Sequence, residues 1–325
     1  MTRLFASVDL GGTYIKCAFA DAEGNIKRSE SVPTKSHEGA IKVLERMAGL
    51  ITDTAQHVGE HPHAVGIGIP GVIDLHQGIT KFLPNFPTDW NGIPVRETLE
   101  PKLGCPVYLL NDVRMATLGE LTYGHGRESS TMVFLALGTG IGGGLVIEGR
   151  LRLGPNGAAA EIGHQTVLPD GPLCGCGNRG CVEALASGPA ITGAGVRLLL
   201  GGQAPVLHEI TGGDVAKVTT ETMAEAVRMG EASVRAVVTK AADYIGIGIA
   251  NMVTTLHPDL IVLGGGVAQM GEVLFVQIRK VLEERVRMVP TEDIAIKPSK
   301  LGPLAGTLGG IALAMKGGLL AEARR

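Results

Sequence analysis

The sequence predicts an α/β protein of two domains, built from a structural unit that occurs twice. The chain of 325 residues is long enough for two domains with substantial cores. Short apolar runs typical of strands alternate with segments whose apolar residues recur at helical spacing. Residues 4–20 and 131–147 share one order, which is an apolar strand, a Gly/Thr turn and a second apolar strand. This repetition indicates a duplicated fold.

In the first copy, strands are expected at residues 4–10 and 15–20, with a further strand from residue 26. The polar residues beside the first turn are Asp9 and Lys16, and the turn itself consists of Gly11, Gly12 and Thr13. Glycines allow backbone N–H groups to surround an anion, so this turn is a candidate phosphate-binding hairpin. By itself, a Gly-Gly-Thr triplet is more often an ordinary hairpin turn.

The second copy has strands at residues 131–137 and 142–147, and its turn consists of Gly138, Thr139 and Gly140. Neither copy is followed directly by a helix, as a dinucleotide-binding βαβ unit or a Walker-type phosphate loop requires. The pattern therefore argues against a Rossmann dehydrogenase. Two phosphate hairpins, one from each half of a duplicated fold, fit a nucleotide held in a cleft between two domains.

Between the two copies, a helix is expected at residues 38–57, a buried strand at 64–69 and another strand at 106–110. Asn111 and Asp112 follow this last strand and precede a helix at 113–121. Open α/β sheets place ligand-binding groups at the carboxyl ends of their strands. Asp112 is therefore a candidate functional acid, although an acid at this junction is also typical of a helix N-cap.

After the second copy, helices are expected at residues 222–229 and 233–256, a strand at 259–263 and a helix at 271–287. A glycine turn at 264–267 precedes that last helix, whose amide-rich end would face a nucleotide. A tight strand-to-helix turn explains the same glycines. A short strand at 294–297 and a helix at 302–315 complete the pattern.

The segment 161–183 combines His164, Cys174, Cys176 and Cys181. Three thiols and one imidazole are the ligands of a four-coordinate structural zinc site. The glycines and prolines between them suit a backbone that wraps around an ion, and they disfavour a helix or strand. Buried thiols or a disulfide are the alternative interpretation. Zinc would hold the neighbouring polar residues in place.

Composition excludes several classes of function. A net charge of −3 with mixed signs and an aromatic content of only 3% disfavour a nucleic-acid partner. We find no apolar stretch near the roughly 20 residues of a membrane span, and residues 1–13 lack the features of a signal peptide. A cytoplasmic protein is expected, since reduced cysteines beside a metal motif fit that compartment.

With these motifs in view, the chain resembles the ROK family (repressor, open reading frame, kinase) of the sugar-kinase/actin-like superfamily. The resemblance extends from Asp9 to the last predicted helix, and it is most specific in Glu161-x-Gly-His164 and in the cysteine-rich run that ends at Glu183. The amino-acid sequence of this segment is most similar to that of bacterial glucokinases. The resemblance implies an actin-like, ribonuclease H-like duplicated fold of two domains with an active-site cleft between them. The expected domains are 1–112 plus 303–325, and 113–302 with the zinc site.

The resemblance also implies an activity, which is ATP-dependent phosphorylation of the 6-hydroxyl of glucose with Asp112 as the general base. Asp9 would orient Mg²⁺ through water, Zn²⁺ would be structural, and the protein would be a homodimer or homotetramer. The residues implied to contact the sugar are Gly71, Asn85, Asn111, Asp112, Glu161, His164 and Glu183. Those implied to bind ATP are Asp9, Gly11, Gly12, Thr13, Lys16, Gly138, Thr139, Gly140, Gly264, Gly265, Gly266 and Val267. The implied zinc ligands are His164, Cys174, Cys176 and Cys181.

One departure from the family pattern concerns the residues after Asn111 and Asp112. The family commonly continues with small residues and Asn, whereas this chain has Val113, Arg114 and Met115. We interpret Arg114 as a solvated helix residue, with a role at the rim of the sugar pocket as the alternative. The sugar therefore stays open between glucose and fructose, mannose, allose, N-acetylglucosamine or N-acetylmannosamine. A sugar-responsive repressor is a further alternative, but the strand at residue 4 leaves no room for its helix-turn-helix.

Overall fold

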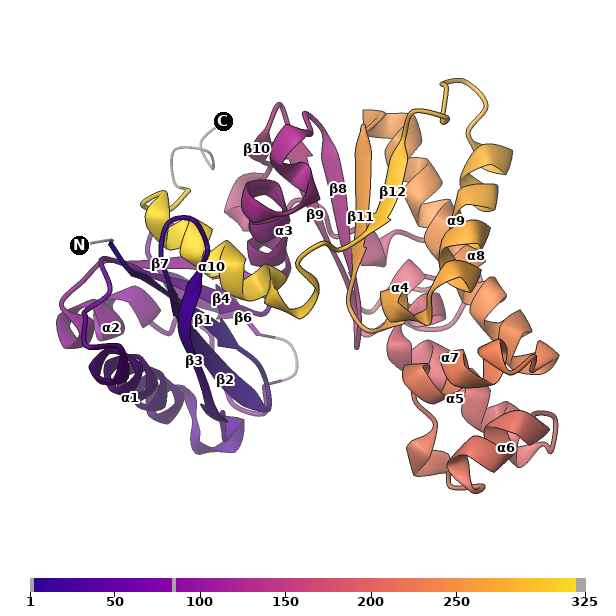
Figure 1. The fold of residues 1–325 in the computed structure, drawn as a ribbon, viewed down its shortest axis with the longest axis horizontal. Coiled ribbons are helices and arrows are strands. Elements are labelled where there is room, and N and C mark those ends of the chain that lie inside the picture. The colour runs from indigo at the N-terminus through magenta and orange to yellow at the C-terminus, as the bar shows by residue number, and fades with distance from the viewer. Residues whose placement is uncertain (1–2, 84–85, 320–325) are drawn as a thin grey trace. The chain divides into compact units, whose positions relative to one another are not determined.

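The computed structural model describes residues 3–83 and 86–319, and it divides into two compact units (Figure 1). Unit 1 comprises Met1–Ser130, Gly144–Ala160 and Ser299–Arg325. Unit 2 comprises Thr131–Gly143 and Glu161–Pro298. The domain boundaries expected from the sequence fall at other positions, and they remain a prediction.

The first sheet has the strand order β3–β2–β1–β4–β7. β1 pairs antiparallel with β2 and parallel with β4, and β4 pairs parallel with β7. The strands expected from apolar periodicity are confirmed within two residues: β1 (Phe5–Leu10), β2 (Tyr14–Ala20), β3 (Ile26–Pro33), β4 (Val65–Ile69) and β7 (Val107–Asn111). A small hairpin of β5 (Val72–Asp74) and β6 (Ile79–Phe82), which the sequence did not predict, lies between β4 and β7 in the chain.

The helices of unit 1 are α1 (Ala40–Val58), α2 (Val95–Leu103), α3 (Asp112–Tyr123) and α10 (Ala305–Met315). α10 packs against β1, β4 and α3. A Cβ atom on Gly309 of α10 would lie 1.7 Å from the carbonyl oxygen of Met115 in α3. Glycine at this position therefore permits the close approach of the two helices, which explains a glycine-rich helix in a buried position.

The second sheet repeats the arrangement of the first, with the order β10–β9–β8–β11–β12. β11 pairs parallel with both β8 and β12, as β4 does with β1 and β7. The duplicated fold predicted from the paired hairpins is confirmed. The strands are β8 (Met132–Leu137), β9 (Ile141–Ile147), β10 (Arg150–Leu151), β11 (Leu260–Gly264) and β12 (Ala295–Pro298).

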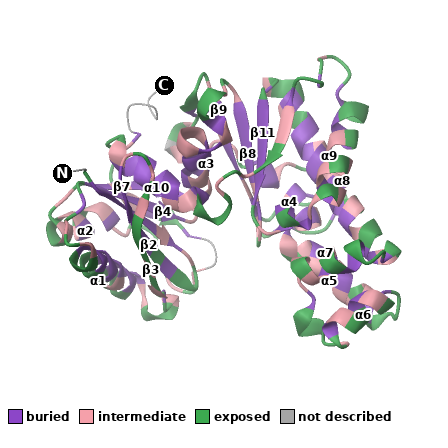
Figure 2. Ribbon diagram, in the orientation of Figure 1, coloured by how far each residue is buried: buried purple, intermediate pink, exposed green. Residues whose placement is uncertain are grey.

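The long helix α8 (Ala232–Leu256) supplies much of the core of unit 2 (Figure 2). Its buried side chains recur every three or four residues and include Val234, Val238, Ile245, Ile249 and Val253. The other helices of this unit are α4 (Val182–Ala186), α5 (Gly188–Leu200), α6 (Pro205–Thr211), α7 (Thr220–Arg228) and α9 (Glu272–Arg285). The single-turn 3-10 helices of the two units are Ser36–Glu38, His125–Glu128, Pro155–Gly157, Ile162–His164, Val215–Lys217, Val267–Met270 and Gly302–Leu304.

The predicted start of the helix at 271–287 is confirmed within one residue, whereas the predicted start of the final helix is wrong by three residues. The 3-10 turn Val267–Met270 and Gly271, at a φ of 81°, separate the glycine turn from α9, so the N-terminus of α9 does not follow that turn directly. The final helix starts at Ala305 because Gly302–Leu304 forms a 3-10 turn. The sequence also missed α2, α4, α5 and α6, whose apolar residues are few or lie between glycines and prolines.

Among the described residues, we find no single helix that is both long and apolar enough to cross a membrane. One bent pair, Val182–Leu200 with Pro205–Thr211, meets the length and composition criteria together.

Candidate functional site

The junction of β7 and α3 is formed by Asn111 and Asp112. Asn111 is the N-cap of α3, since its Oδ1 accepts hydrogen bonds from the backbone amides of Val113 (3.1 Å) and Arg114 (3.2 Å). Its Nδ2 donates to the carbonyl oxygen of Gly71 at 3.1 Å. The cap interpretation of Asp112 is therefore wrong. Asp112 is the first residue of the helix. Its Oδ1 accepts a hydrogen bond from the amide of Val113 at 2.9 Å, and the carboxylate has a second oxygen for another role.

The pKa values of Asp112 and Asp9 are both raised, in each case mainly by burial. Burial raises the pKa of Asp112, and the negative charge of Asp9 raises it further. The hydrogen bond from the amide of Val113 and the guanidinium of Arg114 oppose both effects. Burial likewise raises the pKa of Asp9, with Lys16 opposing the increase. A carboxylate with increased proton affinity is suited to accept a proton from a substrate.

Arg114 is buried, with an exposed fraction of 3%, so its interpretation as a solvated helix residue is wrong. Its Nη1 donates to Oδ1 of Asn111 at 2.9 Å, and its Nη2 donates to the carbonyl oxygen of Ala159 at 2.6 Å. The second partner lies 45 residues away in the chain. Helical periodicity could not reveal this contact.

The first hairpin turn has the compact backbone expected of it. The amide of Gly11 donates to the carbonyl oxygen of Tyr14 at 3.0 Å, and the hydroxyl of Thr34 donates to the carbonyl oxygen of Gly11 at 2.6 Å. Gly12, Thr13 and Lys16 are exposed. The turn therefore presents both backbone and a cationic side chain to solvent, as anion binding requires.

The predicted metal ligands His164, Cys174, Cys176 and Cys181 form one cluster, in which the four ligand atoms all lie within 4.8 Å of one another. Nδ1 of His164 lies 3.7 Å from Sγ of Cys174, and the Sγ atoms of Cys176 and Cys181 are 3.8 Å apart. Ligand atoms of a tetrahedral zinc site lie about 3.6–3.8 Å apart, given Zn–S bonds of about 2.3 Å and a Zn–N bond of about 2.1 Å. The cluster therefore fits a four-coordinate zinc ion.

The thiols of the cluster differ in their pKa values. All five cysteines of the chain are free, so the disulfide interpretation finds no support. Burial, reinforced by the neighbouring thiols, raises the pKa of Cys181 to about 12, whereas the backbone amide of Asn178 lowers the pKa of Cys176. A bound dication stabilises thiolates in such a cluster and releases their protons.

The carboxylate of Glu183 lies between the metal cluster and the second hairpin. Its Oε1 is 3.7 Å from Sγ of Cys174, and its Oε2 accepts a hydrogen bond from the amide of Ile141 at 2.9 Å. Nε2 of His164 is 4.0 Å from Oε2 of Glu161. Glu161 is exposed. The metal segment therefore positions two carboxylates and one imidazole nitrogen.

The second hairpin, residues 138–140, and the strand that leads into it each contact a further glycine position of unit 2. Its Gly138 carbonyl accepts a hydrogen bond from the amide of Gly188, the first residue of α5, at 2.8 Å. A Cβ on Gly265, at a φ of 87°, would lie 2.3 Å from the carbonyl oxygen of Leu137. The turn at 264–267 thus packs on the strand that leads into the hairpin, and only glycine allows this approach.

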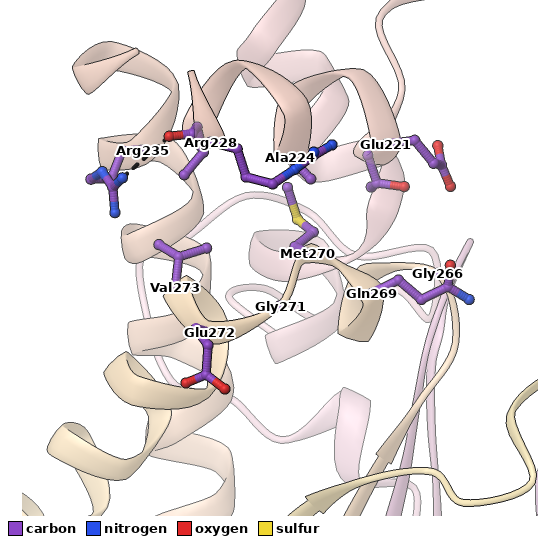
Figure 3. A pocket seen from close by; sticks show the side chains of 12 residues that line it. Glu221, Ala224, Arg228, Arg235, Gly266, Gln269, Met270, Gly271, Glu272 and Val273 are labelled. Atoms are coloured by element: carbon purple, nitrogen blue, oxygen red, sulfur yellow. Dashed lines mark hydrogen bonds between the residues drawn. The ribbon is translucent and has the colours of Figure 1, made fainter. Parts of the chain in front are cut away.

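A pocket of about 680 Å³ begins at Gly266 and extends along α7 and the 3-10 turn Val267–Met270 (Figure 3). Thr220 and Glu221 line it near this glycine, since their side-chain oxygens lie 3.9 Å from the Cβ position of Gly266. Arg228 and Arg235 lie in another part of it. Nη2 of Arg235 donates to the carbonyl oxygen of Val227 at 3.2 Å. Sequence reasoning found Gly266 but missed the other lining residues, because the start of α7 carries no ligand-binding motif.

The structure assembles the predicted residues within each unit. Unit 1 contains Asp9, the first hairpin, Gly71, Asn111 and Asp112, and unit 2 contains the metal ligands, Glu161, Glu183, the second hairpin and the glycine turn at 264–267. Asn85 lies outside the described residues. Unit 1 thus contains a carboxylate with an oriented amide beside it, and unit 2 contains two carboxylates, an imidazole and two glycine turns.

Replacing Gly163 with Ala is expected to disturb the metal segment, because the added Cβ would lie 1.8 Å from the carbonyl oxygen of Ile141. Overpacking of this kind costs about 1–3 kcal/mol. We expect a lower melting temperature and reduced metal content, measured by calorimetry and elemental analysis. Gly175→Ala is the matched control, since nothing lies within 4 Å of its Cβ position. Equal stability and metal content in the two variants would argue against this packing.

Comparison with known proteins identifies the family. The model of the ROK family matches residues 5–317. A glucokinase from Thermotoga maritima is 35% identical over 308 residues, which cover 93% of this chain and 94% of that protein. A ROK family glucokinase from Streptomyces griseus, solved in complex with glucose and AMPPNP, superposes with a TM-score of 0.83 at 32% identity, covering 96% of this chain and 99% of that one. A xylose repressor from Caldicellulosiruptor bescii is 29% identical over 93% of this chain and 76% of the repressor.

The structural match confirms the predicted actin-like α/β fold. The family match extends from β1 to the end of α10, so it includes both sheets, the Asn111–Asp112 junction and the metal cluster. The chain belongs to the ROK family.

Proposed function

We propose that the protein is a glucokinase, which transfers the γ-phosphoryl group of ATP to the 6-hydroxyl of glucose. The observation that carries this proposal is Asp112, a proton-accepting carboxylate at the end of β7 beside the Asn111 cap. Its pKa is raised by burial and by Asp9. The glucokinases from Thermotoga maritima and Streptomyces griseus match nearly the whole chain, which supports this choice within the family.

In the proposed reaction, Asp112 accepts the proton of the 6-hydroxyl while the hydroxyl oxygen attacks the γ-phosphorus. The bond between that phosphorus and the bridging oxygen breaks, so ADP and glucose 6-phosphate are the products. Phosphoryl transfer relies mainly on positioning and on stabilisation of charge. Asn111 contributes to positioning, because its amide orientation is fixed by the contacts to Gly71 and to the start of α3.

The two hairpins are proposed to bind the phosphates of ATP, with Lys16 adding a positive charge beside the first. The pocket at Gly266 has the size for a nucleoside and is proposed to hold the adenosine. Asp9 would orient Mg²⁺ through a water molecule. When bound, Mg²⁺ neutralises charge on the β- and γ-phosphates.

Zn²⁺ is proposed to have a structural role, held by Nδ1 of His164 and by the thiolates of Cys174, Cys176 and Cys181. Nε2 of His164 would then remain available for a sugar hydroxyl. Gly71, Asn85, Asn111, Glu161 and Glu183 are the other proposed sugar contacts. We also propose a cytoplasmic location and a homodimer or homotetramer.

The test is an ADP-coupled assay over glucose, mannose, fructose, allose, N-acetylglucosamine and N-acetylmannosamine, with kcat/KM measured for each sugar. We expect glucose to be preferred by at least about 10-fold, since a missing or unpaired polar contact to a sugar hydroxyl costs this much or more. Preference for another sugar would contradict the glucokinase assignment but retain the kinase. Sugar binding without phosphorylation of any sugar would indicate a sensor.

A further inference from the structure

The guanidinium of Arg114 connects two segments that are distant in sequence. It is buried, and burying a charged group is unfavourable unless hydrogen bonds compensate for lost water. Nη1 bonds to Asn111 at the start of α3, and Nη2 bonds to the carbonyl oxygen of Ala159 at 2.6 Å. Both terminal nitrogens of the guanidinium thus donate hydrogen bonds. The planar arrangement of these donors distinguishes arginine from lysine.

At the first end, Arg114 completes the fixation of the Asn111 side chain. Oδ1 of Asn111 accepts three hydrogen bonds, from the amides of Val113 and Arg114 and from Nη1 of Arg114 at 2.9 Å. Nδ2 donates in the opposite direction, to Gly71. The side-chain amide cannot rotate without breaking several of these bonds. The backbone that carries Asp112 directly follows this anchored residue.

At the second end, Arg114 bonds to a strained segment. Ala160, the residue after Ala159, has a φ of 70°, a left-handed conformation that residues with a Cβ seldom adopt. Such conformations persist where the surrounding structure holds them in place. The carbonyl oxygen that Arg114 holds belongs to the peptide group between Ala159 and Ala160. The next residue in the chain is Glu161.

We propose that Arg114 is a positioning residue with two separable effects, one on Asp112 through the Asn111 cap and one on Glu161 through the Ala159 carbonyl. The proposal rests on the proposed function, in which Asp112 is the base and Glu161 binds the sugar. The hydrogen bond from Arg114 to Asn111 should govern kcat, because misplacement of a reacting group slows the chemical step. The hydrogen bond from Arg114 to the carbonyl oxygen of Ala159 should govern the KM for the sugar.

The experiment compares steady-state constants of Arg114→Met, Arg114→Lys and the double variant Arg114→Met/Ala160→Gly. Arg114→Met removes both hydrogen bonds, so we expect kcat to fall about 10- to 100-fold. We expect the sugar KM to rise about 10-fold and the ATP KM to change less than about twofold. In the double variant, glycine adopts the left-handed conformation without strain. The sugar KM should therefore recover while kcat stays low.

Arg114→Lys retains the charge and one donor group, so it should recover part of kcat. Arg96→Met is the matched control, because Arg96 also donates to backbone carbonyls, including Val107 at the other end of β7 (3.2 Å). This control should lower the melting temperature and leave kcat and both KM values near those of the parent.

Several results would overturn the proposal. One is an Arg114→Met enzyme whose kcat and KM values equal those of the parent. Another is a fall in kcat together with a rise in both KM values that Arg96→Met shows to the same extent. If the double variant had the same sugar KM as Arg114→Met, the proposed effect of Arg114 on Glu161 through Ala159 would be contradicted. If the parent enzyme phosphorylates no sugar, the proposed function fails and the role of Arg114 fails with it. An active parent with unaffected variants contradicts only the role of Arg114.

Discussion

Asp112→Asn is expected to lower kcat for sugar phosphorylation about 10²- to 10⁴-fold, which is the contribution of a well-placed general base. Asparagine has nearly the same shape but cannot accept the proton of the attacking hydroxyl. Because the cap of α3 is Asn111, the substitution leaves that interaction in place. Glucose binding, measured by calorimetry, should change little. Asp53→Asn, on the exposed side of α1, is the control. Near-parental turnover would exclude Asp112 as the base.

The raised pKa of Asp112 makes two linked predictions about pH. The proposed base would act as a carboxylate, so kcat/KM should fall as pH decreases through the pKa of Asp112, which lies above the usual value of about 3.9. The folded state also binds the proton more tightly than the unfolded state, so this group lowers stability as pH rises. Asp112→Asn should therefore raise the melting temperature at neutral pH. A lower melting temperature would contradict burial beside Asp9 as the cause of the shift.

Cys176→Ser is expected to abolish zinc binding and to weaken glucose binding at the same time. Cys176 is exposed, so the loss of its sulfur creates no cavity in the core and reports mainly on metal ligation. Cys105→Ser, outside the cluster, is the matched control. Metal content by elemental analysis and sugar affinity by calorimetry provide the measurements. Unchanged metal content in Cys176→Ser would remove this residue from the ligand set.

The ATP KM should also rise in Cys176→Ser. Glu183 follows the last metal ligand closely and accepts a hydrogen bond from Ile141, the residue directly after the second hairpin turn. Loss of the metal would release this carboxylate and, with it, one support of the proposed phosphate hairpin. A variant with a weaker sugar affinity and an unaltered ATP KM would show that the hairpin is independent of the metal segment.

Features that depend on neighbouring residues could be predicted from the sequence. The metal cluster was predicted because three thiols lie within eight positions and the imidazole lies ten positions before the first. The duplicated sheets were predicted because each hairpin is a continuous segment. In both cases the pattern and the structure that it forms occupy the same short stretch of chain.

Features that depend on distant contacts could not be predicted. Whether Asn111 or Asp112 caps α3 depends on a one-residue difference in where the helix begins, and the two residue types have similar cap preferences. The sequence places Arg114 in a predicted helix, where an arginine is usually solvated. Only the folded chain brings its guanidinium to the carbonyl oxygen of Ala159. The pocket at Gly266 likewise combines residues of α7 and α8 with the segment 266–273, which is distant from them in the sequence.

The most direct test of the proposed phosphoryl transfer is identification of the product by phosphorus NMR, after incubation of the purified protein with ATP, Mg²⁺ and glucose. We predict glucose 6-phosphate in an amount equal to the ADP formed, and an initial rate of its formation that is at least about 100-fold lower with Asp112→Asn. Phosphate on another hydroxyl, or ADP and free phosphate with unchanged glucose, would contradict the proposed reaction.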